Sequence, residues 1–202
     1  MRRLSLSVLA FLCLCLSSCW EKHGKPAVER PYELSQDTMR AGTRDTILTG
    51  VLGEETAMSS LQLVTDNGDT LSICKTSADG IEGRMLGDVR NYEDRVMVMA
   101  KLNAEDELFM STFLNISQLE GNWKDSSTTL SLSSDSSVAS RGTNYTHWRV
   151  ERCRLLLMGE HAMEYGTTQL VDTASIEGLD EDSLWLSIPR HGQLRLGRSQ
   201  AK

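Results

Sequence analysis

The fold of this chain is decided at Leu119-Glu120-Gly121-Asn122-Trp123, which joins two series of short segments with alternating apolar and polar residues. Such alternation is typical of half-buried β-strands, and residues 121–124 are themselves the first strand of the second series. A chain of 202 residues has room for two domains, and its aromatic content of 5% limits the size of any single core. We therefore expect two small β-domains, at 45–117 and 118–199.

The second series contains eight short alternating segments, separated by turn signals at the spacing of a β-sandwich or barrel. The segments are 121–124, 128–133, 138–140, 145–150, 154–158, 169–177, 184–188 and 193–198. Residues 159–166 are interpreted as a turn because Gly159 and Gly166 bound them. Antiparallel strands in sequence order predict an up-and-down barrel, since closure removes the exposed edges of an open sheet.

The first series contains about five strands, with a longer glycine-containing connection before the fourth. Asp66-Asn67-Gly68-Asp69, between two alternating segments, is a strong signal for a hairpin. This arrangement resembles an OB-type barrel. The strands carry few exposed aromatic or basic residues, and the chain has a net charge of -7, so we expect no nucleic-acid partner.

Several short motifs follow one another along the second domain. They are Gly121-Asn122-Trp123, Leu130-Ser131-Leu132, Tyr145-Thr146-His147-Trp148, Leu155-Leu156-Leu157, Asp172-Thr173-Ala174-Ser175-Ile176 and Asp182-Ser183-Leu184-Trp185-Leu186. Their order and spacing resemble the lipocalin-like lipoproteins of Bacteroides and its relatives. The resemblance implies an all-β fold of two small antiparallel barrels, an OB-like domain followed by an eight-stranded lipocalin-like meander barrel. The second domain lacks the long ligand-gating loops of true lipocalins, so a roomy cavity is not implied.

The resemblance also implies a closing pair at one end of the second barrel. In lipocalin-like barrels the Trp of the opening Gly-x-Trp plugs one end, and an Arg from the final strand lies across its ring. Arg198 shares the parity of Leu194 and Leu196 in the final strand, whereas Arg195 has the opposite parity. Trp123 and Arg198 are therefore the expected pair. The alternative is that Trp123 is an ordinary residue at the domain boundary.

The N-terminus predicts export. Arg2 and Arg3 precede an apolar segment at 4–16, which is too short to span a bilayer. Leu16-Ser17-Ser18-Cys19 then resembles the bacterial lipobox, which implies a cleaved signal at 1–18 and a lipid anchor on Cys19. Residue 20 is not Asp, so we expect the outer membrane, with the periplasmic or surface face left open. The alternative is an ordinary signal peptide.

The polar segment at 19–44 contains Pro26 and Pro31 and is predicted to be a flexible tether. Asp37-Thr38-Met39 within it matches the O-glycosylation pattern of Asp, then Ser or Thr, then an apolar residue, which the resemblance to Bacteroides proteins implies for Thr38. The bland alternative is that Asp-Thr is common where turns enter strands. Loss of Arg2 and Arg3 with the signal would change the net charge from -7 to about -9.

The sequence predicts no catalytic residues, no cofactor and no metal. The sequence has no Gly-x-Ser-x-Gly, no His-Glu-x-x-His and no glycine-rich phosphate loop. We interpret His161, Met163 and Glu164 as part of a solvated turn, and the alternative is that they are metal ligands. We interpret Met97, Met99 and Met110 as core residues, and the alternative is that they bind copper. Cys74 and Cys153 are interpreted as buried thiols rather than a disulfide.

The sequence therefore predicts a non-catalytic, lipid-anchored envelope protein that binds or scaffolds something. One alternative is a carrier of a small apolar ligand inside the C-terminal barrel, and another is an inhibitor or accessory subunit that presents loops to a protein partner. An interior cavity would favour the carrier, and an apolar surface patch would favour the accessory subunit.

Overall fold

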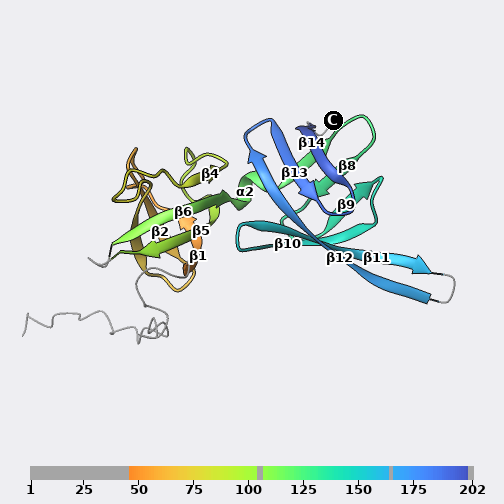
Figure 1. Cartoon of the computed structure of the whole chain (residues 1–202), viewed down its shortest axis with the longest axis horizontal. Helices are drawn as coiled ribbons and strands as arrows, with labels where there is room; N and C mark the ends of the chain where they lie inside the picture. Colours follow the sequence, from red (N-terminus) through yellow and green to blue (C-terminus); the bar gives the residue numbers. More distant parts are fainter. Residues whose placement is uncertain (1–45, 104–106, 164–165, 200–202) are drawn as a thin grey trace, which may run out of the picture. The chain divides into compact units, whose positions relative to one another are not determined.

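The computed structural model describes residues 46–103, 107–163 and 166–199, which are almost entirely β-structure (Figure 1). The predicted sites Cys19 and Thr38, and the predicted tether at 19–44, lie outside these ranges. No helix in the described part of the chain has the length and apolar character needed to cross a membrane.

Six strands form the first sheet: β1 (Thr46–Leu52), β2 (Ser60–Thr65), β3 (Thr70–Cys74), β4 (Arg84–Leu86), β5 (Arg95–Leu102) and β6 (Leu108–Asn115). Five of them close into a barrel in the order β1-β2-β3-β6-β5-β1. The predicted hairpin joins β2 to β3, where Gly68 has a φ of 87°. Closure depends on a parallel pairing of β3 with β6, and β4 also pairs parallel to β6; the sequence predicted neither parallel pairing nor β4 itself.

A short helix, α2 (Ile116–Leu119), follows β6 directly. Asn115 caps the helix, because its side-chain oxygen accepts a hydrogen bond from Gln118 N at 3.0 Å. The side chain of Asn115 is fully buried, and its Nδ2 donates to Asp94 Oδ2 at 2.7 Å and to the carbonyl of Asp88 at 2.9 Å. These contacts fix the direction in which the chain leaves the first barrel.

Eight strands form the second sheet: β7 (Gly121–Lys124), β8 (Thr129–Leu132), β9 (Val138–Arg141), β10 (Tyr145–Glu151), β11 (Arg154–Met163), β12 (Gly166–Leu179), β13 (Ser183–Ile188) and β14 (Gly192–Arg198). Each strand of the order β10-β11-β12-β13-β14-β7-β8-β9 pairs antiparallel with the next. An isolated bridge between Ser137 and His147 links the two ends of this order, at β9 and β10. Trp148 N donates to Ser136 O at 2.9 Å on the same side. The predicted all-β fold of two small barrels, the second an eight-stranded meander, is confirmed.

The prediction of a turn at 159–166 is wrong. The ladder between β11 and β12 runs without interruption from Arg154 opposite Ser175 to Met163 opposite Gly166, which makes a long hairpin. Gly159 marks instead the position where β10 begins, since a Cβ atom there would lie 1.9 Å from Asn144 O. Figure 1 shows the far end of this hairpin extending beyond the other strands of its sheet.

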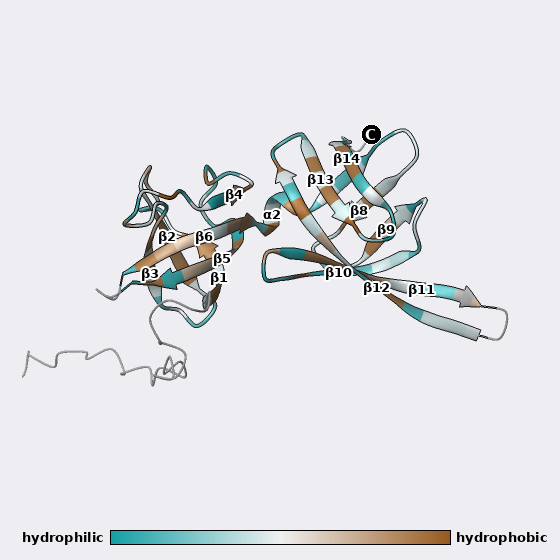
Figure 2. Cartoon of the chain, in the orientation of Figure 1, coloured by the Kyte–Doolittle hydropathy of each residue, from teal (hydrophilic) through white to brown (hydrophobic). Residues whose placement is uncertain are grey.

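Buried apolar residues form the cores of the two barrels. Figure 2 shows the corresponding brown, apolar segments along the strands of both. Among the side chains that fill the second barrel are Leu130, Leu155, Leu157, Leu184, Leu186 and Leu196. The same cluster continues through Leu119 into Leu86, Met97 and Leu114 of the first sheet. A second, smaller cluster lies within the first barrel and includes Phe113.

Hydrogen bonds also join the two sheets, and all described residues belong to one compact unit of the chain. Gly87 N donates to Leu179 O at 3.0 Å. Nη2 of Arg84 donates to the carbonyls of Ile176 and Glu177, at 2.9 Å in each case. Backbone groups of β12 are therefore partners of the first sheet as well as of the barrel to which they belong.

Candidate functional site

One end of the second barrel is closed by Trp123. Its indole is fully buried, and Nε1 donates to Leu119 O at 2.8 Å. The Cζ atom of Arg198 lies 4.2 Å from the centroid of the indole, a cation–π distance. Arg198 also donates from Nη2 to Gln118 O at 2.6 Å and from Nη1 to Glu120 O at 3.0 Å. The guanidinium therefore joins the buried ring to the backbone that leads into β7.

Gly121 is required beside this pair. Its φ is +137°, a backbone conformation that residues other than glycine rarely adopt. A Cβ atom there would also lie 2.6 Å from Nη1 of Arg198. Arg195, with the opposite parity, lies outside the barrel with its Cζ atom 4.7 Å from the ring centroid of Trp185. Each arginine of the last strand thus packs on a tryptophan, but only Trp123 is buried.

At the β13–β14 turn, a polar cluster lies within the barrel wall. Tyr145 and Asp172 are both buried, and the tyrosine hydroxyl donates to Asp172 Oδ2 at 2.7 Å. Nε of Arg190 lies 3.3 Å from Asp172 Oδ1, and the ring of His191 meets that of Tyr145 edge-on at 5.9 Å. Burial raises the pKa of Tyr145, and the hydrogen bond to Asp172 raises it further. All partners in this cluster are engaged with one another, so we assign it a structural role.

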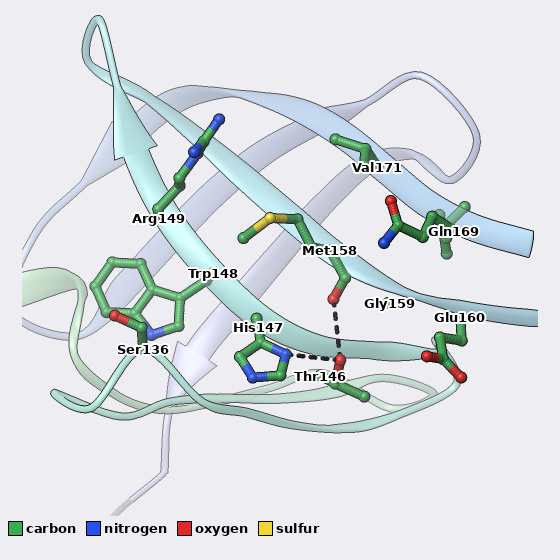
Figure 3. Close-up of a pocket in the computed structure, with 11 residues that line it drawn as sticks. Ser136, Thr146, His147, Trp148, Arg149, Met158, Gly159, Glu160, Gln169 and Val171 are labelled. Atoms are coloured by element: carbon green, nitrogen blue, oxygen red, sulfur yellow. Dashed lines mark hydrogen bonds between the residues drawn. The ribbon is translucent and has the colours of Figure 1, made fainter.

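The outer face of β10, β11 and β12 carries a groove of about 570 Å³, which we call the Met158 groove (Figure 3). Met158 lies in its centre between His147 and Val171, because these three residues are cross-strand partners. Glu160 and Gln169 lie at one end. Thr146 bonds both Nδ1 of His147, at 3.0 Å, and the carbonyl of Met158. The floor is apolar, and the polar groups stand around it.

A second hollow of about 510 Å³ lies next to this groove on the same outer face, since Leu156 in its lining is two residues before Met158. We call it the arginine hollow. Arg152 and Arg154 line it together with Leu156, Thr173 and Met99 of β5. Glu151 also lines the hollow, and its carboxylate is engaged by Arg149. Its volume, like that of the Met158 groove, is in the range of small-molecule sites.

Among the residues that the structure describes, neither arginine of the hollow has an ionic partner. Arg149 is engaged with Glu151 at 3.3 Å, whereas within the described ranges no carboxylate lies within 4.0 Å of the guanidinium of Arg152 or Arg154. Both side chains are exposed. The hollow therefore combines two available cations with the apolar surface of Met99 and Leu156.

The turn that contains Arg152 is held in place by contacts between Cys153 and Met97 of β5. Arg152 and Cys153 have φ values of 52° and 53°, the left-handed pair that a two-residue hairpin turn needs. Cys153 is buried, and its N–H donates to Sδ of Met97 at 3.3 Å while its Sγ donates to the carbonyl of Met97 at 3.7 Å. The anchoring of Cys153 positions Arg152 at the rim of the hollow.

The other residues that the sequence suggested as metal ligands do not come together in a site. His161 and Met163 are exposed on β11, and Glu164 lies outside the described residues. Met97 and Met110 belong to two different core clusters, which agrees with their interpretation as core residues. In the parts of the chain that the structure describes, no group of three or more His, Cys, Asp or Glu side chains could hold a metal ion.

Cys74 and Cys153 do not form a disulfide. Cys153 is buried as predicted, whereas Cys74 is half-buried. The outer-face residues were missed by the sequence reasoning. The run Arg149, Arg152 and Arg154 in an acidic chain was the available signal.

Comparisons with known proteins give one similarity. No family model matches this chain, and no curated protein matches it. A solved structure of a lipocalin-like protein from Bacteroides thetaiotaomicron VPI-5482 is 22% identical, with a TM-score of 0.34. The similarity covers 40% of this chain and 95% of that protein.

Proposed function

We propose that this protein is a non-catalytic binding module of the bacterial envelope, held at the outer membrane by a lipid on Cys19. Its ligand is a small molecule with an apolar body and an anionic group, bound on the outer face of β10–β12. The observation that carries the proposal is the pair of unengaged arginines, Arg152 and Arg154, beside the apolar side chains of Met99 and Leu156.

The charge of the chain makes this arrangement unusual. A net charge of -7 repels anions from most of the surface, so two neighbouring cations without carboxylate partners create a local exception. Guanidinium groups bind carboxylate, phosphate and sulfonate groups with charge-assisted hydrogen bonds. We therefore assign the anionic group to the arginine hollow and the apolar body to the surface that continues from Leu156 to Met158.

The outer face is preferred to the barrel interior for a physical reason. Large side chains fill the interior, including Trp123, Leu155 and Leu157, all of them fully buried. A barrel of eight short strands leaves an interior about wide enough for its own side chains. The carrier alternative, with an apolar ligand inside the barrel, is therefore not favoured.

Binding of 8-anilinonaphthalene sulfonate, which combines apolar rings with a sulfonate, tests the proposal in the full chain carrying Cys19→Ala. We expect Arg154→Gln to raise the dissociation constant at least about tenfold, because one charge-assisted hydrogen bond contributes roughly 1.5–3 kcal/mol. Arg141→Gln is the matched control, since Arg141 is exposed on β9 and does not line either hollow. Equal effects of the two substitutions, or no binding of the probe, would contradict the proposal.

A further inference from the structure

The far part of the β11–β12 hairpin consists of two strands with no third strand beside them. Pairing of β10 with β11 ends at Tyr145 opposite Gly159, and pairing of β12 with β13 begins at Ser175 opposite Ser187. Residues 160–163 and 166–174 therefore each have one strand edge without a neighbouring strand among the described residues. A two-stranded hairpin on its own is marginally stable in water.

The side chains at the far end of the hairpin are also exposed to solvent. The side chains that the structure describes between residues 160 and 169 are all exposed. Met163 is 60% exposed and Val171 is 51% exposed. Figure 2 shows the far end of the hairpin in pale and teal colours, in contrast to the brown strands of the barrels. Leu170 is buried and belongs to the core cluster of the second barrel, but the described side chains between it and the tip of the hairpin have no core beneath them.

The two edges differ in length and in charge. The edge of β11 spans only four residues, 160–163, and begins with Glu160. On β12, Arg190 reaches Asp172, so the β13–β14 turn lies beside that position and the open edge is 166–171. These six residues, Gly166-Thr167-Thr168-Gln169-Leu170-Val171, carry no charge. Edge strands are usually protected from pairing by charged residues or proline, and this one has neither.

We propose that residues 166–171 of β12 pair antiparallel with the same residues of a second copy of this chain. An antiparallel pair of identical strands is self-complementary, because a two-fold axis places the donors of each edge opposite the acceptors of the other. With the axis at Thr168, the two Thr168 side chains face each other, and a Thr–Thr pair is a favourable cross-strand pair. The product is a four-stranded sheet in the order β11-β12-β12-β11.

Charge favours a second copy at this place over other parts of the surface. Two bodies with a net charge of -7 each repel one another, and an uncharged edge on a projecting hairpin lets them pair while most of the charge stays apart. Pairing uses the strand edges and leaves the outer face of β10–β12 uncovered. Gln169 and Val171 belong both to the pairing segment and to the Met158 groove, whereas Arg152 and Arg154 of the arginine hollow lie outside residues 166–171.

Sedimentation equilibrium of the full chain carrying Cys19→Ala, over roughly 1 to 100 µM, tests this proposal without any contribution from an acyl chain. We expect a monomer–dimer equilibrium in which Thr168→Lys raises the dissociation constant at least about tenfold, because lysine on an edge opposes pairing and the two-fold axis doubles its charge. Thr173→Lys is the matched control, on the same strand and equally exposed, but beyond the pairing residues. It should change the dissociation constant less than about twofold.

A monomer at all concentrations would overturn the proposal. A dimer that Thr168→Lys leaves unchanged, or that Thr173→Lys weakens to the same degree, would equally exclude pairing through residues 166–171. Circular dichroism of both variants checks that the barrels are folded. Because probe binding is measured separately, failure of the dimer and failure of the ligand site are distinguishable outcomes.

Discussion

Arg198 packs its guanidinium on the buried indole of Trp123, with Cζ 4.2 Å from the ring centroid, while two of its nitrogens donate to backbone carbonyls of the segment before β7. The indole itself donates to Leu119 O, in the same segment. The indole and the guanidinium therefore both bind carbonyls of residues 118–120. Their contributions to stability should depend on each other.

A double-mutant cycle measures this dependence. We expect Trp123→Ala to cost about 3–5 kcal/mol in the free energy of unfolding, because it removes a fully buried side chain. Arg198→Ala should cost less, about 1–3 kcal/mol, from the cation–π contact and the lost hydrogen bonds. The double variant should lose less than the sum by at least about 0.5 kcal/mol in urea unfolding. Additive losses would show that the two residues act separately.

Arg195 and Trp185 supply the control for that cycle. They form a similar contact at 4.7 Å, but Trp185 is 42% exposed. A cation–π contact at an exposed site contributes about 0.5–1 kcal/mol. Arg195→Ala should therefore cost no more than about 1 kcal/mol, and a loss as large as that from Arg198→Ala would remove burial as the explanation.

Gly121→Ala should destabilise the protein by two separable effects. The φ of +137° is strained for alanine, and the new Cβ would lie 2.6 Å from Nη1 of Arg198. We expect a loss of about 1–3 kcal/mol. In the Arg198→Ala background the close contact is absent, so the loss in thermal or urea unfolding should be smaller but not zero. An identical loss in both backgrounds would assign the whole effect to the backbone.

Stability should fall at alkaline pH because of Tyr145. Its pKa in the folded protein is raised by burial and by Asp172, so its contribution is fully present below the unfolded pKa of about 10 and is lost as the pH rises toward the folded value. Tyr145→Phe should cost about 1–3 kcal/mol at pH 7, since Asp172 loses a donor. Above pH 10 the two proteins should converge in urea unfolding. Parallel curves up to pH 11 or so would contradict this assignment.

The lipid anchor has its own test. If the lipobox-like sequence before Cys19 functions as such, Cys19→Ala should release the protein from the outer-membrane fraction into the soluble fraction. The mature protein should begin at residue 19 and carry the mass of its acyl groups. Membrane association that survives the substitution, or a mature N-terminus elsewhere, would refute the prediction. Intact mass from the native host would also show whether Thr38 carries a sugar.

The alternation of apolar residues was sufficient to predict the strands of both barrels and the parity of Arg198. It failed where glycine was read as a turn signal, because Gly159 permits the close approach of Asn144 in the middle of β11. It also missed α2, since four residues with an Asn cap are too short for a helical period to appear. Short helices and long hairpins carry little local signal.

The outer-face site is invisible to sequence for a different reason. Arg152 and Arg154 are close to Leu156 along the chain, but Met99 comes from a strand more than fifty residues earlier. Likewise Met158 meets Val171 only through the register of β11 and β12. The parallel pairing of β3 with β6 is equally non-local. Contacts of this kind depend on tertiary pairing, which residue patterns do not encode locally.

The capping hydrogen bond from Gln118 N to the side chain of Asn115 limits how the two barrels can be exchanged between genes. A recombination event at residues 117/118 would cut α2 in two, leaving its Asn115 cap with one parent and Gln118 with the other. It would also divide a core cluster that draws Leu86, Met97 and Leu114 from the first sheet. Exchange of one barrel between genes should therefore destabilise the protein, and related proteins should keep the two barrels together.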